Sequence, residues 1–251
     1  MTTYYARGLS AERLERCYTL APPRMQRYLE QEIAHLLRHV RPGDRVLELG
    51  CGYGRVAERV AQAGALVTGI DVAGRSLELA RQRAAAAGLA SRCDYRLMDA
   101  LALDLPDATF DVVACVQNGI GAFRVDALRM AREAWRVLKP RGLLLLSTYA
   151  DAVWPDRLAW FEAQAAEGLV GALDYSASLA GTIVCRDGFR STRATAQELR
   201  ALGDALGVAA QIEEVDASSL WCTLRKPASS SVVSTSTGAA DVPSNNRSPS
   251  P

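Results

Sequence analysis

The sequence lacks several features that would indicate particular classes of protein. Lysine occurs only at Lys139 and Lys226, and the formal net charge is only +1. A nearly neutral chain has no overall positive electrostatic field that would attract nucleic acid or an anionic membrane surface. The longest aliphatic run, at residues 142–147, is far too short to span a bilayer. The amino-terminal stretch is dotted with arginine and glutamate, so we expect no signal peptide.

Cysteine and histidine are present, but not in arrangements typical of redox or metal sites. The six cysteines form no Cys-x-x-Cys pair, which favours a reducing, cytoplasmic location with cysteine used as a small hydrophobic residue. The two histidines, His35 and His39, are four residues apart in a predicted helix, a spacing that can share a metal ion. No third ligand suggests itself. We therefore expect no metal and interpret the pair as part of a solvated helix face.

The sequence is rich in a regular alternation of strand-like and helix-like patterns. Strand-like runs occur at residues 45–49, 66–71, 93–99, 110–116 and 143–148. Helix-like segments separate them; two stop at Gly64 and Gly88, and the last runs through Leu138 to the sequence KPRG. This alternation predicts right-handed βαβ units around a buried parallel sheet.

The segments before and after this alternation have other patterns. Ahead of it, Ser10 is placed to cap one helix and a second helix begins near Pro23, so we assign residues 1–40 to a helical cap segment. After residue 150 come an aromatic-rich amphipathic helix, a hairpin that turns at Asp187-Gly188, another helix and two strand-like runs.

We therefore predict one domain over residues 41–227, with an insertion at about residues 150–192. Residues 228–251 are dominated by Ser, Thr, Pro, Asn and Gly without periodicity. Such a segment buries too little apolar surface to order itself, so we expect a disordered tail.

The stretch LELGCGYG, residues 47–54, places three glycines in five positions directly after a predicted strand. Glycines at such a place let a ligand approach the backbone closely. A dinucleotide site would need a glycine where Arg55 stands, and no Gly-Lys-Ser/Thr follows to make a phosphate P-loop. The alternative without a ligand is that the glycines form a tight turn and the nearby aspartates cap helices.

The pattern E-x-G-x-G-x-G from Glu48, with Asp71 at the end of the next strand, resembles motifs I and II of class I S-adenosylmethionine-dependent methyltransferases. The stretches LMDA (97–100), FDVV (110–113) and REAWRVLKPRGLLLLS (132–147) are similar to later segments of that family. The resemblance covers roughly residues 40–148 and fits loosely to about residue 226. It implies a Rossmann-like, doubly wound, mostly parallel seven-stranded α/β sheet with an antiparallel terminal hairpin.

The resemblance also implies that S-adenosyl-L-methionine is the cofactor and S-adenosyl-L-homocysteine the product. Glu48 would orient the glycine loop and favour the ammonium group, Asp71 would bind both ribose hydroxyls, and Asp99 would accept the adenine amine. Arg24 is a candidate for the methionyl carboxylate. The cofactor-binding set that the resemblance implies is Glu48, Gly50, Cys51, Gly52, Gly54, Asp71, Val72, Asp99, Ala100, Val116 and Gln117.

The acceptor side is less defined by the resemblance. Gln117 and Asn118 follow the fourth strand, where they should lie beside the transferring methyl group; alternatively, Asn118-Gly119 is only a turn. Aromatic residues outside the sheet form either a lid over the site or ordinary packing; they are Tyr4, Tyr5, Tyr18, Tyr149, Trp154, Trp160 and Phe161. We predict catalytic roles for Asn118 and Tyr18, and acceptor binding by Tyr18, Asn118, Tyr149 and Trp154.

We therefore expect a methyltransferase with a small-molecule acceptor and no nucleic-acid or membrane partner; monomer and dimer both remain open. The segment after the fourth strand lacks the Asp/Asn-Pro-Pro-Tyr/Phe motif of amino-methylating DNA enzymes. With no histidine near a strand end, the expectation is a nitrogen or sulfur acceptor, or an already acidic oxygen, rather than an unactivated hydroxyl. A thiol or metalloid acceptor is a minor alternative. The alternative to an enzyme is a non-catalytic methyltransferase-like domain that acts through a partner protein.

Overall fold

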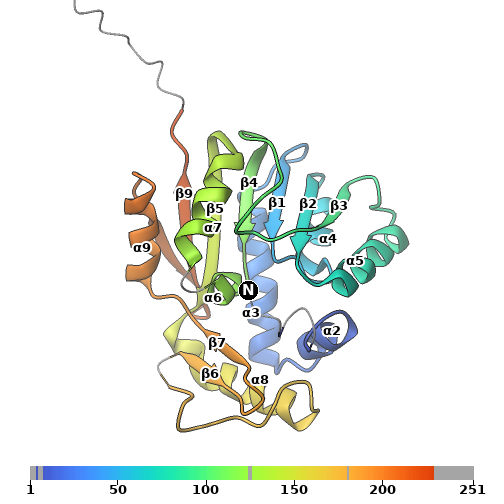
Figure 1. Cartoon of the computed structure of the whole chain (residues 1–251), viewed down its shortest axis with the longest axis vertical. Helices are drawn as coiled ribbons and strands as arrows, with labels where there is room; N and C mark the ends of the chain where they lie inside the picture. Colours follow the sequence, from blue (N-terminus) through green and yellow to red (C-terminus); the bar gives the residue numbers. More distant parts are fainter. Residues whose placement is uncertain (1–3, 5–7, 124–125, 180, 229–251) are drawn as a thin grey trace, which may run out of the picture.

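A seven-stranded sheet forms the centre of the computed structural model, which describes residue 4 and residues 8–123, 126–179 and 181–228 (Figure 1). The strand order is β3-β2-β1-β4-β5-β9-β8. The strands are β1 (Arg45–Leu49), β2 (Leu66–Asp71), β3 (Cys93–Leu97), β4 (Phe110–Cys115), β5 (Leu138–Tyr149), β8 (Gln211–Val215) and β9 (Ser219–Arg225). The first five pair in parallel, and β9 pairs antiparallel with both β5 and β8. The expected Rossmann-like sheet with an antiparallel terminal hairpin is confirmed.

Helices cover both faces of the sheet because its central strands are apolar on both sides. On one face Val46, Val67 and Val112 pack against α3 (Pro23–Leu37), α4 (Arg55–Gln62) and α5 (Gly74–Ala86). On the other, Leu47 and Val113 pack against α7 (Ala127–Val137) and α9 (Ala196–Ala205). Neighbouring strand residues thus point to opposite cores, as in parallel sheets that are buried on both faces.

The fifth strand begins earlier than its apolar run suggests. It was expected at residues 143–148, after a helix extending through Leu138, but α7 ends at Val137 and β5 starts at Leu138. Arg141 adopts a positive φ of 68°, its N–H donates to the carbonyl of Lys226, and the pairing with β4 shifts register between Phe110 and Val112. The sequence KPRG therefore forms an irregularity inside the strand and not the expected boundary.

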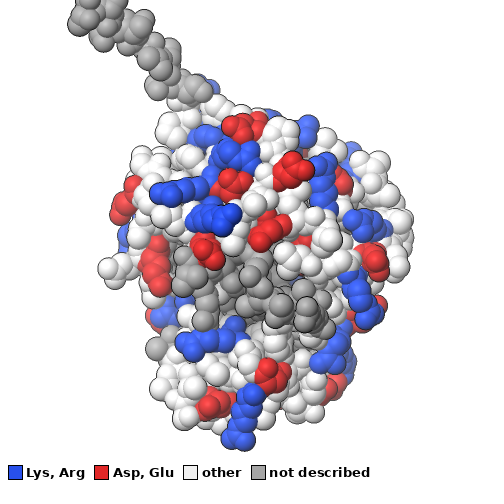
Figure 2. Space-filling model, viewed as in Figure 1, with Lys and Arg blue, Asp and Glu red and all other residues white. Residues whose placement is uncertain are grey.

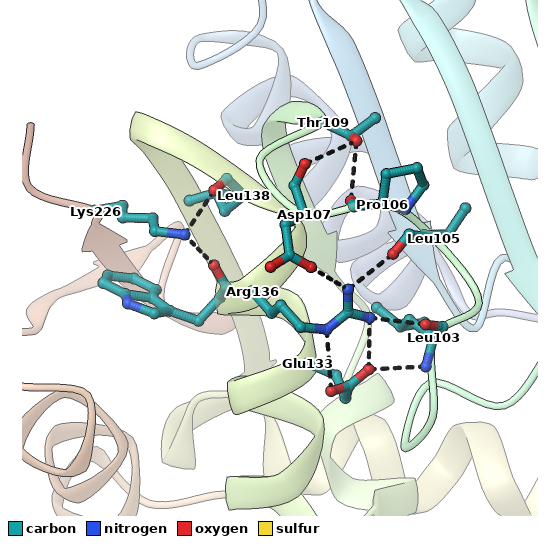
Figure 3. Close-up of polar contacts among 10 residues, drawn as sticks. Leu103, Leu105, Pro106, Asp107, Thr109, Glu133, Arg136, Leu138 and Lys226 are labelled. Carbon is teal, nitrogen blue, oxygen red and sulfur yellow. Dashed lines mark hydrogen bonds and ion pairs between the residues drawn. The ribbon is translucent and has the colours of Figure 1, made fainter. Parts of the chain in front are cut away.

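The connection between β3 and β4 is held in place by one arginine of α7. Figure 3 shows the guanidinium of Arg136 donating to the carbonyls of Leu103 (2.7 Å) and Leu105 (2.8 Å). The same group pairs with Asp107 (2.6 Å) and Glu133 (2.9 Å). This connection begins at Met98 and includes Ala100, so the contacts of Arg136 fix the chain shortly after that position.

The segments outside the sheet gather at the carboxyl ends of the parallel strands. They are α2 (Glu12–Thr19), the 3-10 turn η2 (Asp151–Val153), α8 (Trp154–Ala166) and the hairpin of β6 (Thr182–Val184) and β7 (Arg190–Thr192), which lie below the sheet in Figure 1. The short helix α6 (Gly119–Phe123) follows β4 and contacts β7. Asp187 and Gly188 connect β6 and β7, which confirms the predicted hairpin.

The start of α2 differs from the sequence prediction. Ala11, with φ of 51°, stands at the N-cap position, and no side chain caps the helix, so Ser10 does not have the expected role. Instead the N–H of Ala11 donates to the hydroxyl of Ser76 on α5 (2.8 Å). Arg13 donates to the carbonyls of Gly168 and Leu169 beyond α8. Tertiary contacts on both sides thus position α2 in place of a local cap.

The surface in Figure 2 intersperses basic and acidic side chains, in keeping with the net charge of +1. Within the described ranges, no helix combines the length and apolar character that crossing a membrane requires. Tyr5 and all of the predicted disordered tail except Ala228 lie outside the described residues.

Candidate active site

A cavity of about 190 Å³ lies where the strand ends meet α2, α8 and the β6–β7 hairpin. The loops after β1, β2 and β4 line one side of it, and α8, β7 and the end of β5 line the other. The carboxyl ends of strands in open α/β sheets are where such folds bind ligands. The cavity is therefore the candidate active site.

The three glycines of residues 50–54 all have positive φ angles, but they meet different surroundings. Gly50, at φ 74°, lines the cavity, and a Cβ there would meet no atom within 4 Å. Gly54, at φ 82°, does not line the cavity; a Cβ there would lie 2.7 Å from the hydroxyl of Tyr95 and 3.0 Å from the Cβ of Ala80. All three positions thus favour glycine because of their positive φ angles. At Gly50 the missing side chain also leaves open space in the cavity, and at Gly54 it makes room for Tyr95 and Ala80.

Asp71 ties the glycine loop to the end of β2. Its Oδ2 accepts the N–H of Gly52 and its Oδ1 accepts the N–H of Ala73, each at 2.8 Å. Burial raises the pKa of Asp71, while these backbone N–H groups lower it. Because an ionised carboxylate has about four acceptor positions, Asp71 can hold the loop and still accept hydrogen bonds from a ligand.

Glu48 and Arg55 bring opposite charges to the cavity wall. Glu48 is 5% exposed, and its Oε2 has no hydrogen-bond partner among the residues that the structure describes. Burial raises the pKa of Glu48 to about 8, which the charge of Arg55 opposes. The Nε and Nη2 of Arg55 are buried without hydrogen-bond partners in the same described set, and its guanidinium lies 5.1 Å from the ring centroid of Tyr18. The Nη1 of Arg55 lies 4.0 Å from a carboxylate oxygen of Glu30, which leaves its other two nitrogens available. A carboxyl oxygen and guanidinium nitrogens without hydrogen-bond partners suit the zwitterionic end of an amino acid.

Gln117 and Asn118 form a turn after β4, as one interpretation of the sequence expected. Both residues also line the cavity, as the other interpretation expected. Their φ angles are 55° and 59°. Gln117 donates its backbone N–H to the hydroxyl of Ser147 (2.9 Å), and its Nε2 is buried without a partner in the described part of the chain. The Asn118 side chain donates to the carbonyl of Thr192 (3.1 Å) and accepts from the hydroxyl of Thr148 (2.6 Å). Asn118 therefore connects the β4 loop to the hairpin.

Four of the aromatic residues considered as a lid line the cavity: Tyr18, Tyr149, Trp160 and Phe161. Tyr4 lies further out, where it packs on Phe189 and donates to Asp187. Trp154 does not line the cavity; it packs in the cluster formed by α2, α8 and the hairpin. Its predicted role in acceptor binding is therefore not supported by its place in the fold.

Two further residues of the expected site lie elsewhere. Asp99 does not line the cavity, and its carboxylate accepts the N–H of Leu101 (2.8 Å), although Ala100 beside it does line the wall. Arg24 pairs with Asp216 (2.8 Å) in the β8–β9 turn, so it does not point toward the site as expected. The role of Asp99 at an adenine ring stays a prediction.

The histidines do not form the solvated face that their spacing suggested. His35 is 2% exposed and packs on Trp221 with ring centroids 4.5 Å apart. The Nε2 atoms of His35 and His39 are 3.4 Å apart, and burial lowers the pKa of both. No cluster of three metal-binding side chains exists among the described residues.

Several cavity residues were missed by the sequence reasoning. Arg55 stands next to the glycine loop, and Gln164 is a polar residue four positions after Trp160 in an amphipathic helix, so both carried a readable signal. Leu14, Phe189 and Ser191 had no such signal, because only the packing of α2 and the hairpin brings them to the strand ends.

Comparison with known proteins identifies the family of this core. Residues 46–142 match the family of methyltransferase domains. The 27-O-demethylrifamycin SV methyltransferase of Amycolatopsis mediterranei is 39% identical over 111 residues, covering 44% of this chain and 40% of that protein. The ubiquinone biosynthesis O-methyltransferase of Haemophilus ducreyi is 38% identical over 109 residues, covering 42% and 45%. This chain therefore spans less than half the length of these relatives.

A solved structure extends the likeness beyond that core at the level of the fold. A SAM-dependent methyltransferase from Methanosarcina mazei superposes with a TM-score of 0.59 at 21% identity, covering 77% of this chain and 97% of the other. A TM-score of this size over most of both chains shows a shared fold. The match of residues 46–142 to methyltransferase domains and the shared fold both support a class I S-adenosylmethionine-dependent methyltransferase domain, a family whose cofactor is S-adenosyl-L-methionine.

Proposed function

We propose that this protein transfers the methyl group of S-adenosyl-L-methionine to a small-molecule acceptor. The observation that supports this most is that one cavity joins the glycine loop, Glu48 and Asp71 to the aromatic residues of α8 and the hairpin. Such a cavity gives one ligand a polar, backbone-lined region and a second ligand an apolar one next to it.

The cofactor side fits the chemistry of S-adenosyl-L-methionine. Glu48 and Arg55 would hold the amino and carboxylate groups, and Asp71 would accept from the ribose hydroxyls while it fixes the loop. When bound, the cofactor supplies a methyl group on a sulfonium, and the electron pair of the broken C–S bond stays with sulfur. The contribution of this chain is to align the acceptor atom with that bond and to exclude water.

The acceptor atom that we propose is the oxygen of an acidic hydroxyl. The names of both relatives specify oxygen, which lends no support to the nitrogen or sulfur preference drawn from the sequence. Of the described residues, the cavity lining contains no histidine to act as a base. An acidic hydroxyl releases its proton to water as its oxygen gains the methyl group, so it needs no strong base from the protein.

The domain organisation belongs to the same proposal. Residues 41–227 would form the methyltransferase domain, with the insertion at about 150–192 supplying the acceptor side, and residues 1–40 would cap the cavity. The cysteine spacing continues to favour a cytoplasmic location. A non-catalytic domain that acts through a partner protein is the second candidate, because fold alone does not determine activity.

Isothermal titration with S-adenosyl-L-methionine, S-adenosyl-L-homocysteine and NAD tests the proposal, with Asp71→Ala measured in parallel. We expect micromolar binding of the first two ligands and at least a tenfold loss in the variant, because the loop loses two hydrogen bonds and the ribose an acceptor. Product release with phenolic and enolic acceptors then tests transfer. Binding of NAD alone would contradict the cofactor assignment. Cofactor binding without transfer to any acceptor would favour the second candidate.

A further inference from the structure

Glu32 is a buried carboxyl group that the proposed methyl transfer leaves without a role. It lies in α3, where it is 1% exposed, and neither of its carboxyl oxygens has a hydrogen-bond partner of suitable geometry among the described residues. It does not itself line the cavity. A buried carboxylate without a partner costs free energy, so a charge of this kind calls for a compensating positive group.

Glu32 lies directly behind the cofactor side of the cavity. Burial raises the pKa of its carboxyl group to about 7, and four neighbouring groups oppose this increase. Two of them are the hydroxyls of Ser147 and Tyr28, and the other two are the charge of Arg55 and the backbone N–H of Gln117. Arg55 and Gln117 line the cavity. One layer of residues therefore separates this carboxyl group from a bound ligand.

Arg55 is shared by two buried carboxyl groups. Its charge opposes the increase in pKa that burial causes at Glu48 as well as at Glu32. Asp71 adds a third carboxyl group, which lines the cavity and raises the pKa of Glu48. When all three carboxyl groups are ionised, one guanidinium does not balance them, so this side of the cavity favours a ligand that brings positive charge.

The other titratable groups that face Glu32 do not supply positive charge. Tyr28 on the same helix and Tyr149 on β5 are phenols, and Cys115 on β4 is a thiol. Burial raises the pKa of each of them above its usual value, so all three are neutral near pH 7. Glu30, on the exposed side of α3, adds a further carboxylate.

The two forms of the cofactor differ by one positive charge at sulfur. S-adenosyl-L-methionine carries a sulfonium besides its ammonium and carboxylate groups, whereas S-adenosyl-L-homocysteine has a neutral sulfur. Gln117 is expected beside the transferring methyl group, and its N–H is one of the groups that act on Glu32. The positive sulfur would thus lie on the side of this carboxyl group, and protein in place of water between them strengthens their attraction.

We propose that Glu32 enables the site to discriminate between cofactor and product, because its buried carboxylate stabilises the sulfonium of S-adenosyl-L-methionine and not the neutral sulfur of S-adenosyl-L-homocysteine. The inference rests on the proposed methyl transfer and adds a specificity-determining residue that acts from behind Gln117 and Arg55. The sulfonium and a proton compete for the same carboxylate. Cofactor binding therefore releases a proton from Glu32 to solvent, and the proton returns once sulfur has lost its methyl group. This exchange favours release of the product.

Titration calorimetry of Glu32→Gln at pH 8 tests the residue with three ligands: S-adenosyl-L-methionine, S-adenosyl-L-homocysteine and sinefungin, which carries a cationic amine in place of the sulfonium. We expect the variant to weaken both cationic ligands at least about fivefold and S-adenosyl-L-homocysteine less than about twofold. At pH 5.5 Glu32 is protonated in the unaltered protein, so the difference between the two proteins should nearly vanish.

Glu78→Gln, at an exposed position of α5, removes the same charge far from water-excluded protein and serves as the matched control. It should change the affinity for none of the three ligands. An equal loss for all three ligands in Glu32→Gln, or a loss that persists at pH 5.5, would show that the side chain only packs and would overturn the proposal.

Proton release provides a test on the unaltered protein. Calorimetry at pH 7 in two buffers of different ionisation enthalpy measures the protons released on binding. We expect S-adenosyl-L-methionine to release more protons than S-adenosyl-L-homocysteine, and Glu32→Gln to reduce this difference. Equal release by both ligands would contradict the inference. If the unaltered protein binds neither ligand, the proposed function fails; if it binds both without these differences, only this inference fails.

Discussion

The two sides of the cavity are built in different ways. The side formed by β1, β2 and β4 uses backbone groups, glycines with positive φ and a carboxylate at a strand end, within the 24 residues from Glu48 to Asp71 and the loop after β4. The opposite side uses side chains from α2, α8 and the hairpin, which are far apart in sequence. The first side therefore depends on local backbone conformation and the second on long-range packing.

The comparison also explains what each side can bind. Backbone amides and side chains of opposite charge suit the constant polar groups of a cofactor. This side tolerates little change because the loop conformation requires glycine. Side chains on a separate helix and hairpin can change without disturbing the sheet, so they suit an acceptor that differs between family members. The following variants test this division, from the largest expected effect to the smallest.

Gly54→Ala should destabilise the protein most, because the new Cβ meets Tyr95 and Ala80 at a φ of 82°. We expect a loss of about 2–4 kcal/mol in the free energy of unfolding, measured by urea denaturation. Gly88→Ala is the matched control, since its φ is 70° and its Cβ would meet nothing within 4 Å. Equal losses in the two variants would show that packing at Gly54 contributes nothing beyond backbone strain.

Glu32→Gln should change how stability depends on pH. Burial raises the pKa of Glu32 from 4.5 to about 7, opposed by the hydroxyls of Ser147 and Tyr28. The folded state thus holds a proton that the unfolded state releases, so the free energy of unfolding falls as pH rises from about 4.5 to 7. Glutamine does not ionise, so the variant does not lose stability in this way. Measured against the unaltered protein, the variant should therefore gain up to about 3 kcal/mol of unfolding free energy between pH 4.5 and pH 8.

Urea denaturation at several pH values measures the effect of Glu32→Gln. Glu78→Gln, at an exposed position of α5, serves as the control and should follow the unaltered protein. Parallel profiles for the Glu32 variant and the unaltered protein would show that Glu32 does not titrate in this range.

Asn118→Gly should separate the two sides of the cavity. It removes the bonds to Thr192 and Thr148 but suits the φ of 59°, whereas Asn118→Ala adds backbone strain. We expect Asn118→Gly to lower the free energy of unfolding by about 2 kcal/mol and to weaken acceptor binding, while affinity for S-adenosyl-L-homocysteine changes less than about threefold. A larger loss of cofactor affinity than of acceptor affinity would place Asn118 with the cofactor side.

Gly50→Ala should have the smallest effect on stability. Its φ is 74° and its Cβ would stand in open space, so we expect a loss of about 1 kcal/mol from strain alone. Calorimetry should nevertheless show at least about tenfold weaker binding of S-adenosyl-L-homocysteine, because the methyl group stands in the space that a ligand needs. Unchanged affinity would mean that the loop backbone does not contact the cofactor.

Much of the sheet and of the cofactor side could be predicted from the sequence. The first two strands match residues 45–49 and 66–71, because a strand buried on both faces is a continuous apolar run bounded by turns. Of the predicted cofactor residues, Glu48, Gly50 and Asp71 line the cavity, since strand ends and glycine turns are local features. Their contact with the cofactor remains a prediction.

The errors occur where a distant partner decides the outcome. Ser10 does not cap α2 because Ser76 of α5 binds the N–H of Ala11. Arg24 pairs with Asp216, almost two hundred residues away in sequence, and His35 is buried against Trp221. Helix periodicity identifies which residues share a face, but it does not say whether that face meets solvent or another element.

The sequence by itself determined the order of strands and helices, the positive-φ glycine loop and the carboxylates at the ends of β1 and β2, because each depends on short-range backbone geometry and apolar patterning. Only the tertiary structure decided which side chains complete the cavity. The docking of α2, α8 and the hairpin against the strand ends brings Tyr18, Gln164 and Phe189 to one space. That arrangement depends on long-range packing, which no local pattern encodes.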